Sequence, residues 1–222
     1  REKAASVLQA RGFATRAVSL GKTPLVLSRF GAAFGSLAAG PKKGLRPMRI
    51  NKVAFIGKGG VGLLYGSMIA CALGDDAVEF VMDDARYERH VADQLKINGE
   101  PSNLRSVRAS EATPADLVIL TIKTTGLTQA LDTMEAVVSP ETRIASLCNG
   151  ITSEQKIAER FGWQRTGLGI CQGMDAVFLN NELTYGRPGE IRFGAAPDTD
   201  PAVVADIADL YSRAGIAHVV EP

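Results

Sequence analysis

The stretch Lys52-Val-Ala-Phe-Ile-Gly57-Lys58-Gly59-Gly60-Val61-Gly62-Leu-Leu-Tyr-Gly66 decides the fold of this chain. Its apolar start, Val53–Ile56, suits a short buried strand. Three glycines with the spacing G-x-G-x-x-G follow, and the apolar pattern after them predicts a helix over Val61–Leu73. A strand that enters a tight glycine turn and leaves as a helix presents backbone N–H groups and a favourable helix dipole to phosphate.

Apolar strand-like runs alternate with helix-like segments after this stretch. The run Asp116–Ile122 is continuously apolar, which is typical of a parallel strand covered on both faces. The alternation predicts right-handed βαβ units and an open α/β sheet, mostly parallel and doubly wound, of the Rossmann type. The other expected elements are strands at Ala77–Met82 and Arg143–Leu147, helices at Ala85–Gln94 and Leu127–Val138, and a helix capped by Ser153.

Two parts of the chain depart from this alternation. Short strands are expected at Leu95–Ile97 and Leu104–Ala109, on either side of a turn at Asn98-Gly99. Beyond Gly167 we expect four further short strands, a helix and a last strand, at Leu168–Cys171, Ala176–Leu179, Leu183–Tyr185, Glu190–Phe193, Pro201–Ala214 and Ile216–Val220.

The formal charge of +1 hides an asymmetry along the chain. Residues 1–47 carry nine Lys or Arg and one acid, a net +8, whereas residues 48–222 carry 16 basic and 23 acidic residues, a net −7. An acidic core excludes a basic nucleic-acid binder. We expect residues 1–47 to be a disordered basic extension of a dinucleotide-binding domain over 48–222. Met48 resembles a natural start, which favours a tail or translated upstream sequence over an organellar transit peptide.

Cysteine and histidine usage gives no sign of a disulfide framework or a metal site. Cys71, Cys148 and Cys171 show no C-x-x-C spacing, which indicates reduced thiols and a cytoplasmic location. His90 and His218 lack partners at ligand spacing, so we expect surface or hydrogen-bonded histidines and no metal. No run reaches the roughly 20 apolar residues of a membrane span, so no membrane partner is expected.

The glycine turn predicts a dinucleotide site. Gly57 permits the tight turn, Gly59 lets the backbone approach a pyrophosphate, and Gly62 lets the helix pack close to the sheet. The remaining residues of the predicted cofactor-binding turn are Lys58, Gly60 and Val61.

The acid after the second strand bears on the choice of cofactor. Asp83 lies 26 residues after Gly57, about where an acid meets the ribose 2′-hydroxyl of NAD, so Asp83 favours NADH. Arg86 could instead serve a 2′-phosphate if Asp83 points away. A solvated surface acid or a helix cap is the alternative interpretation of Asp83.

Four predicted site residues fall just past the carboxyl ends of four expected strands, where open α/β sheets bind ligands: Gly57, Asp83, Lys123 and Asn149. The Lys123 ammonium could meet a cofactor hydroxyl or a substrate carboxylate, or it could extend to water. The Asn149 amide can donate and accept at once, which suits a ribose or a carboxamide, although Asn149-Gly150 could also be a plain turn.

Several ordered motifs resemble the ketopantoate reductase (2-dehydropantoate 2-reductase) family from about Ile50 to Pro222. The motifs are Phe55-Ile-Gly-Lys-Gly-Gly-Val-Gly62, Asp116-Leu-Val-Ile-Leu-Thr-Ile-Lys123, Leu147-Cys-Asn-Gly-Ile151, Gly173-Met-Asp-Ala176 and Gly189-Glu-Ile-Arg-Phe-Gly194. The resemblance implies NADPH-dependent reduction of 2-dehydropantoate, a small 2-oxo acid, to (R)-pantoate in pantothenate biosynthesis. It also implies that Lys123, Asn149 and Ala176 contact the cofactor.

The chain departs from this family in two ways. Many members carry an Arg after the second strand to hold the 2′-phosphate, where this chain has Asp83. The family's general-acid lysine lies in a helical C-terminal domain, which also suits a homodimer contact and which we expect beyond Pro222. We therefore expect the 222 residues to be inactive alone. The alternatives are a related two-domain dehydrogenase acting on glycerol 3-phosphate, opines or sugar acids, and a non-catalytic dinucleotide-binding module.

Overall fold

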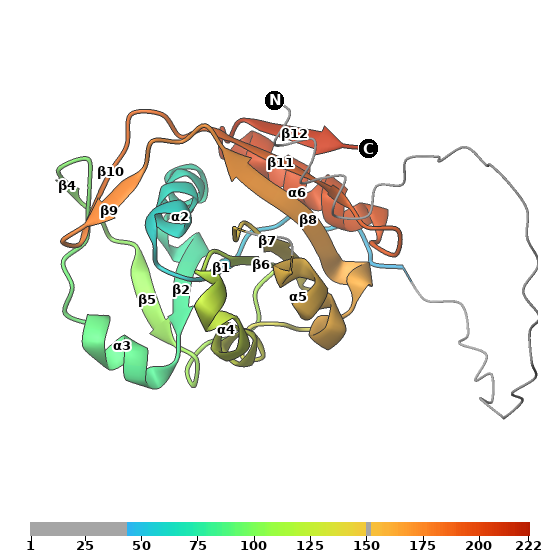
Figure 1. Cartoon of the computed structure of the whole chain (residues 1–222), viewed down its shortest axis with the longest axis horizontal. Coiled ribbons are helices and arrows are strands. Elements are labelled where there is room, and N and C mark those ends of the chain that lie inside the picture. The colour runs from blue at the N-terminus through green and yellow to red at the C-terminus, as the bar shows by residue number, and fades with distance from the viewer. Residues whose placement is uncertain (1–43, 150–151) are drawn as a thin grey trace, which may run out of the picture. The chain divides into compact units, whose positions relative to one another are not determined.

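A sheet built on both sides of β1 (Val53–Ile56), the strand that enters the glycine turn, forms the centre of the fold (Figure 1). The computed structural model describes residues 44–149 and 152–222, of which Leu45–Pro222 form one compact unit. β1 pairs in parallel with β2 (Val78–Met82) on one side and with β6 (Leu117–Leu120) on the other. The direction of the strand order therefore changes between β1 and β6.

The complete main sheet has eight strands within the described residues. In spatial order they are β12 (His218–Glu221), β11 (Glu190–Ala195), β8 (Thr166–Gln172), β7 (Arg143–Ser146), β6, β1, β2 and β5 (Arg105–Arg108). The six strands from β8 to β5 are parallel and follow the 3-2-1-4-5-6 order of a Rossmann fold. β11 runs antiparallel to β8, and β12 is parallel to β11. The predicted fold class is confirmed.

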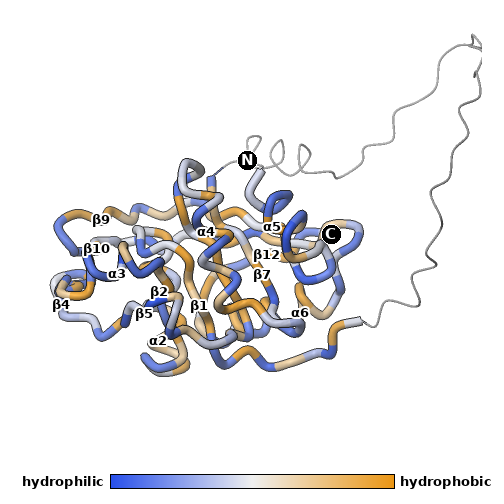
Figure 2. Tube along the Cα trace, turned by 90° about the horizontal axis from the view of Figure 1, so that it is seen from below, coloured by the Kyte–Doolittle hydropathy of each residue, from blue (hydrophilic) through white to orange (hydrophobic). Residues whose placement is uncertain are grey.

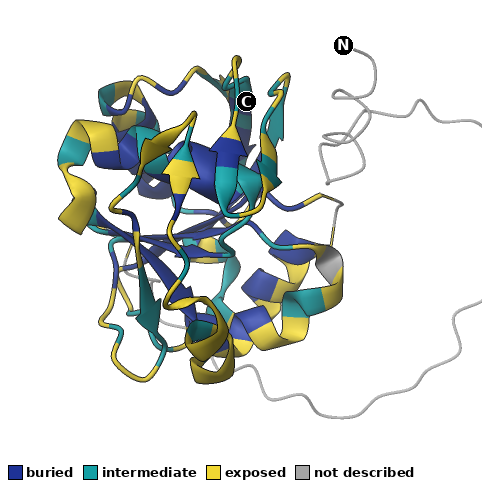
Figure 3. Ribbon diagram, turned by 90° about the vertical axis from the view of Figure 1, so that its left-hand side faces the viewer, coloured by how far each residue is buried: buried dark blue, intermediate teal, exposed yellow. Residues whose placement is uncertain are grey.

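Helices cover both faces of this sheet (Figure 1). α2 and α6 pack on the face that carries Val53 and Phe55, and α4 and α5 pack on the face that carries Ala54 and Ile56. Because neighbouring residues of a strand point to opposite faces, both sets are buried, which explains the continuous apolar run. Apolar residues follow β1 in the interior (Figure 2), and the helices turn their buried sides inward (Figure 3). The described helices are α2 (Gly60–Leu73), α3 (Asp84–His90), α4 (Leu127–Met134), α5 (Ser153–Phe161) and α6 (Pro201–Arg213).

A second, four-stranded sheet brings a distant hairpin next to the glycine turn. Asn180 and Asn181 connect β9 and β10 with φ angles of 50° and 60°, the left-handed conformation that tight hairpin turns require. Phe178 Cβ lies 3.7 Å from the position that a Cβ added to Gly60 would take. The spatial order of this sheet is β4 (Glu100–Pro101), β3 (Lys96–Ile97), β10 (Glu182–Thr184) and β9 (Val177–Leu179).

The short strands expected at Leu95–Ile97 and Leu104–Ala109 are present as β3 and β5, but they do not pair with each other. Glu100–Pro101 is the segment that pairs with β3 across the Asn98-Gly99 turn. The segment Arg105–Arg108 crosses to the main sheet instead and pairs with β2 as β5. The reason is that Leu95 O accepts from Ser102 N at 3.0 Å and closes the small hairpin before the chain reaches Leu104.

The prediction that Ser153 caps α5 is wrong. Thr152 is the N-cap residue, and Ser153 is the first residue of the helix. The Ser153 hydroxyl is engaged elsewhere, because it lies 2.9 Å from Ser146 Oγ and donates to Glu154 Oε2 at 2.7 Å. All three side chains are buried, so the serine contributes to a polar contact between α5 and β7.

The described residues before Met48 are bonded to the domain. Leu45 N donates to Asp200 Oδ2 at 2.7 Å, and the Arg143 guanidinium donates to the carbonyl of Arg46. The compact unit therefore begins at Leu45, three residues before Met48. Residues 1–43 of the predicted extension, and the Gly150-Ile151 pair, lie outside the described residues.

Candidate functional site

The four predicted residues at strand ends lie along one edge of the sheet. Gly57 directly follows β1 and Asp83 directly follows β2. Lys123 and Asn149 lie three residues beyond the ends of β6 and β7. Because these strands are parallel neighbours in the order β7-β6-β1-β2, their carboxyl ends meet at the same edge. Ligands of open α/β sheets bind at this edge, where the strand order changes direction.

The packing of the protein itself requires glycine at two positions of the turn. Gly57 has a φ of +119°, and a Cβ there would lie 2.6 Å from the carbonyl oxygen of Thr121. A Cβ on Gly62 would lie 2.3 Å from the carbonyl oxygen of Gly57. Thr121 Oγ1 also donates to that same oxygen at 2.8 Å. The turn is therefore held tightly between α2 and the end of β6.

Gly59 has no such requirement. Its φ is −103°, which any residue adopts, and a Cβ there would meet no protein atom within 4 Å. Gly59 is the N-cap of α2, whose first backbone N–H groups have no partner within the helix. A glycine at this place leaves room for a ligand to approach the backbone closely. The turn thus fits the pyrophosphate of a dinucleotide.

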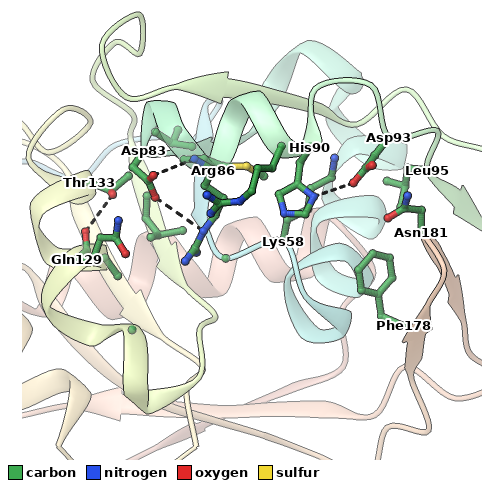
Figure 4. A pocket seen from close by; sticks show the side chains of 17 residues that line it. Lys58, Asp83, Arg86, His90, Asp93, Leu95, Gln129, Thr133, Phe178 and Asn181 are labelled. Carbon is green, nitrogen blue, oxygen red and sulfur yellow. Dashed lines mark hydrogen bonds and ion pairs between the residues drawn. The ribbon is translucent and has the colours of Figure 1, made fainter.

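A pocket of about 420 Å³ opens beside the turn (Figure 4). The ends of β1 and β2, α3 and the loop after it, α4 and the β9–β10 turn line it. The structure brings Gly57, Lys58 and Asp83, three of the predicted residues, together in its wall. The pocket is large enough for a nucleoside, and its wall combines apolar strand ends with charged side chains from α3.

Asp83 is the N-cap of α3. Its Oδ1 accepts from Arg86 N at 2.9 Å, and its Oδ2 lies 3.8 Å from Arg86 Nε. The helix-cap interpretation of Asp83 therefore describes its contacts in this structure, although the carboxylate also lines the pocket. A contact between Asp83 and a ribose stays a prediction.

Lys58 supplies positive charge at the other end of the pocket, beside His90. Lys58 Nζ donates to Ser106 Oγ on β5 at 3.0 Å. Burial lowers the pKa of the Lys58 ammonium, and Asp93 opposes this effect in part. His90 Nδ1 lies 2.8 Å from Asp93 Oδ2, and this hydrogen bond lowers the pKa of Asp93.

Seven of the predicted cofactor residues do not line this pocket: Gly59, Gly60, Val61, Gly62, Lys123, Asn149 and Ala176. Lys123 and Asn149 are exposed and lie on the β6 and β7 side of the edge. The carbonyl oxygen of Ala176 lies 3.9 Å from the position of a Cβ on Gly60, next to the first turn of α2. Gly60 and Val61 are the first two residues of α2. The cofactor contacts of these seven residues stay predictions.

Sequence reasoning missed several groups that shape the site. Thr121 holds the glycine turn, and Gln129 and Thr133 enter the pocket from α4. Phe178 and Asn181 enter it from the β9–β10 hairpin. The Asn-Asn turn indicates a hairpin there, but no pattern in the sequence places that hairpin beside α2.

The described residues offer no metal centre. Within 44–149 and 152–222, no group of three or more His, Cys, Asp or Glu side chains is placed to hold a metal ion. His90 is paired with Asp93, and His218 Nδ1 lies 2.8 Å from the carbonyl oxygen of Ile216. In the same part of the chain, every helix is too short or too polar to cross a membrane.

The strand order, the ligand edge and the glycine turn together define a Rossmann-type domain of the dinucleotide-binding class. Residues 53–198 match the family model described as ketopantoate reductase PanE/ApbA. The chain therefore belongs to the ketopantoate reductase family of nicotinamide-dependent oxidoreductases.

Solved structures of this fold include two 2-dehydropantoate 2-reductases. The enzyme of Geobacter metallireducens GS-15 is 24% identical with a TM-score of 0.65 over 77% of this chain, and that of Porphyromonas gingivalis W83 is 21% identical with 0.62 over 78%. A D-mandelate dehydrogenase with NADH and anilino(oxo)acetate is 22% identical with 0.66 over 77%. The matched regions span 57%, 64% and 56% of those three chains. No curated protein matches the chain significantly in sequence.

Proposed function

We propose that this chain is the cofactor-binding portion of a 2-dehydropantoate 2-reductase, which reduces the ketone of 2-dehydropantoate to (R)-pantoate in pantothenate biosynthesis. Gly59 is the residue on which the proposal rests most directly, because no contact with the protein and no φ angle requires glycine there, whereas a closely approaching ligand does. Membership of the ketopantoate reductase family supports a nicotinamide cofactor and a 2-oxo acid substrate.

The residues of this chain bind and orient the cofactor in this proposal. The N–H groups at the start of α2 bind the pyrophosphate, and Lys123 and Asn149 contact the nicotinamide end or the substrate carboxylate further along the edge. When bound, the cofactor supplies the hydride from nicotinamide C4. The developing alkoxide also needs a general acid, which we place beyond Pro222. The 56–64% coverage of the three structural neighbours is consistent with that division.

A second candidate is a dehydrogenase of the same class that acts on another 2-oxo or 2-hydroxy acid. The similarity to a D-mandelate dehydrogenase favours this candidate, since its TM-score of 0.66 is as high as those of the reductases. A non-catalytic dinucleotide-binding module is the third candidate. The coding sequence downstream of Pro222 separates it from the first two: a helical domain with an inward-facing lysine supports a reductase, and a stop codon supports the module.

Titration of the purified 222-residue chain with NADH and NADPH, followed by nicotinamide fluorescence, tests the proposal. We expect saturable binding of at least one cofactor. Addition of 2-dehydropantoate, or of phenylglyoxylate for the mandelate-type candidate, should then leave the nicotinamide absorbance unchanged. Turnover would contradict a general acid beyond Pro222, and a lack of binding to either cofactor would contradict the proposal as a whole.

We also propose that the reaction takes place in the cytoplasm. Cys71, Cys148 and Cys171 show no C-x-x-C spacing, which suits reduced thiols and a reducing compartment. A fluorescent fusion at the C-terminus tests this location in cells. Import into an organelle would instead support a transit peptide within residues 1–47.

A further inference from the structure

Thr121, the first residue after β6, holds the glycine turn from inside the protein. Its side chain is buried, and its Oγ1 donates to the carbonyl oxygen of Gly57 at 2.8 Å. The same Oγ1 would lie 2.6 Å from a Cβ on Gly62, so the hydroxyl fills the space between the turn and the first residues of α2. The apolar run of β6 is therefore followed by a polar side chain at the place where the chain meets the turn.

The backbone of Thr121 is fixed independently of this hydroxyl. Its N–H donates to the carbonyl of Ile56 at 2.9 Å and continues the pairing of β1 with β6. On the other side, the carbonyl of Leu120 accepts from Leu147 N at 2.9 Å. The strand that carries Thr121 thus stays in the sheet without the side-chain hydrogen bond. What the hydroxyl fixes is the orientation of the Gly57 carbonyl.

The orientation of the Gly57 carbonyl sets the direction of the next N–H group. Every peptide bond of the described residues is trans, and a trans peptide directs its N–H opposite to its carbonyl. The Gly57 carbonyl points to Thr121 and to α2, so the Lys58 N–H points away from both. α4 covers the face of the sheet opposite to α2, and its residues line the pocket together with Gly57 and Lys58 (Figure 4). The Lys58 N–H therefore faces the side of the turn on which the pocket lies.

The backbone N–H groups of Lys58 and Gly59 have no hydrogen-bond acceptor within residues 44–149 and 152–222. N–H groups without a protein partner are satisfied by water or by a ligand. The missing side chain of Gly59 leaves space beside these two donors, because a Cβ there would meet no protein atom within 4 Å. Successive N–H donors next to the N-terminus of a helix suit the oxygen atoms of a pyrophosphate.

We propose that Thr121 is a positioning residue for the pyrophosphate of the cofactor: by holding the Gly57 carbonyl, its hydroxyl aims the Lys58 N–H at a phosphate oxygen. This inference rests on the proposed function, since it requires a dinucleotide at the glycine turn. Thr121 acts through the peptide between Gly57 and Lys58 and does not touch the ligand. It therefore affects NADH and NADPH equally, and it affects only ligands that carry phosphate at the turn.

Thr121→Val, which keeps the shape of the side chain and removes its hydroxyl, tests the inference in the 222-residue chain. ADP-ribose carries the pyrophosphate without the nicotinamide, and calorimetric titration should show about tenfold weaker binding, the factor for one hydrogen bond to a charged group. NADH and NADPH should weaken by the same factor. Adenosine, which lacks phosphate, should compete for the pocket of Thr121→Val as well as for that of wild type. Thr121→Ser keeps the hydroxyl and should bind all four ligands like wild type.

Thr166→Val is the matched control, because the buried Thr166 also donates its hydroxyl to a glycine carbonyl, that of Gly162 at 2.9 Å, but at the start of β8. Both valine variants should lower the urea midpoint to a similar degree, and Thr166→Val should bind ADP-ribose like wild type.

Three results would overturn the inference. Unchanged affinity of Thr121→Val for ADP-ribose would show that the hydroxyl does not orient a phosphate donor. An equal loss for adenosine would show that Thr121 shapes the pocket as a whole, and an equal loss in Thr166→Val would attribute the effect to lower stability. In each of these cases wild type still binds the cofactor and the proposed function stands. A wild type that binds none of the four ligands would overturn the proposed function, and the inference with it.

Discussion

The two edges of the parallel sheet use polar residues in opposite ways. At the amino-terminal edge, Asp116 Oδ2 accepts from the backbone N–H groups of Asn51 and Lys52 at 2.8 and 3.0 Å. At the carboxyl-terminal edge, the charges of Lys58 and Arg89 have no ion pair within the described residues. Polar groups of the first edge are satisfied by the protein and serve its stability. At the second edge, the charges of Lys58 and Arg89 remain available to a ligand.

Arg143, the first residue of β7, shows how completely the amino-terminal edge is closed. The side chain is fully buried, and its Nε donates to Asp206 Oδ2 on α6 at 2.8 Å. Its two other nitrogens donate to the carbonyls of Glu141 and Arg46. Asp206 Oδ1 accepts from Met48 N at 3.1 Å. One ion pair therefore joins the sheet, α6 and the segment that enters the domain.

Loss of the ion pair between Arg143 and Asp206 should have the largest effect on the free energy of unfolding. Arg143→Met leaves the Asp206 carboxylate, only 5% exposed, without its partner, so we expect a loss of about 3–5 kcal/mol in the free energy of unfolding. Urea unfolding measures this loss. Arg143→Met combined with Asp206→Leu removes both charges and should recover much of it. A loss below about 1 kcal/mol in the single variant would mean that the pair is not important for stability.

The glycine turn allows a sharper comparison within a single motif. Gly62→Ala places a methyl group 2.3 Å from the carbonyl of Gly57, so it should cost about 1–3 kcal/mol of stability. Gly59→Ala meets no protein atom within 4 Å and should cost only the preference for glycine at an N-cap, about 0.5–1 kcal/mol.

Cofactor titration of the two variants completes the test. Gly59→Ala should lose affinity for the dinucleotide although its urea midpoint changes little, because its new methyl group occupies the ligand's space. Unchanged affinity in Gly59→Ala would remove the main support for a pyrophosphate at this turn. Gly62→Ala, in contrast, should lower both the affinity for the dinucleotide and the stability in urea, since the turn itself must shift.

The pattern of apolar residues along the sequence predicted the strands whose burial can be inferred from a single segment. The runs of β1, β2 and β6 are mostly apolar because both faces of the sheet are covered, and the ends of the first two runs are sufficient to place Gly57 and Asp83 on one edge. The part of the pocket that Phe178 and Asn181 line was not predictable in this way. Phe178 and Asn181 reach it through the pairing of β3 with β10, a contact between segments that are far apart in sequence and only two or three residues long.

The contacts of Asp83 show that prediction from sequence has the same limit for a single residue. An acid after the second strand suits both a ribose contact and a helix cap, and the sequence alone does not show that α3 starts at Asp84 with Asp83 as its cap. Asp83→Ala removes the cap and should cost about 1 kcal/mol in unfolding free energy. Asp83→Asn keeps an N-cap side chain and should cost less. If Asp83 binds the ribose of NADH, Asp83→Asn should weaken NADH clearly, whereas a pure cap predicts no change.

The smallest expected effect concerns the stability cost of Lys58. Burial lowers the pKa of its ammonium below the ordinary value of 10.5, so the charged form is less favourable in the folded than in the unfolded chain. The cost is therefore largest at pH values below the folded pKa and disappears above 10.5, where the amine is neutral in both states. Lys58→Met should stabilise the protein at pH 7 by a few tenths of a kcal/mol, since the site is partly solvated.

Urea unfolding of wild type and Lys58→Met at pH 7 and near pH 10.5 measures this difference, with Lys96→Met as the control for an exposed lysine. The advantage of Lys58→Met should shrink as the pH rises, and Lys96→Met should show no such trend. A Lys58→Met variant less stable than wild type at pH 7 without cofactor would show that the hydrogen bond to Ser106 already compensates the buried charge.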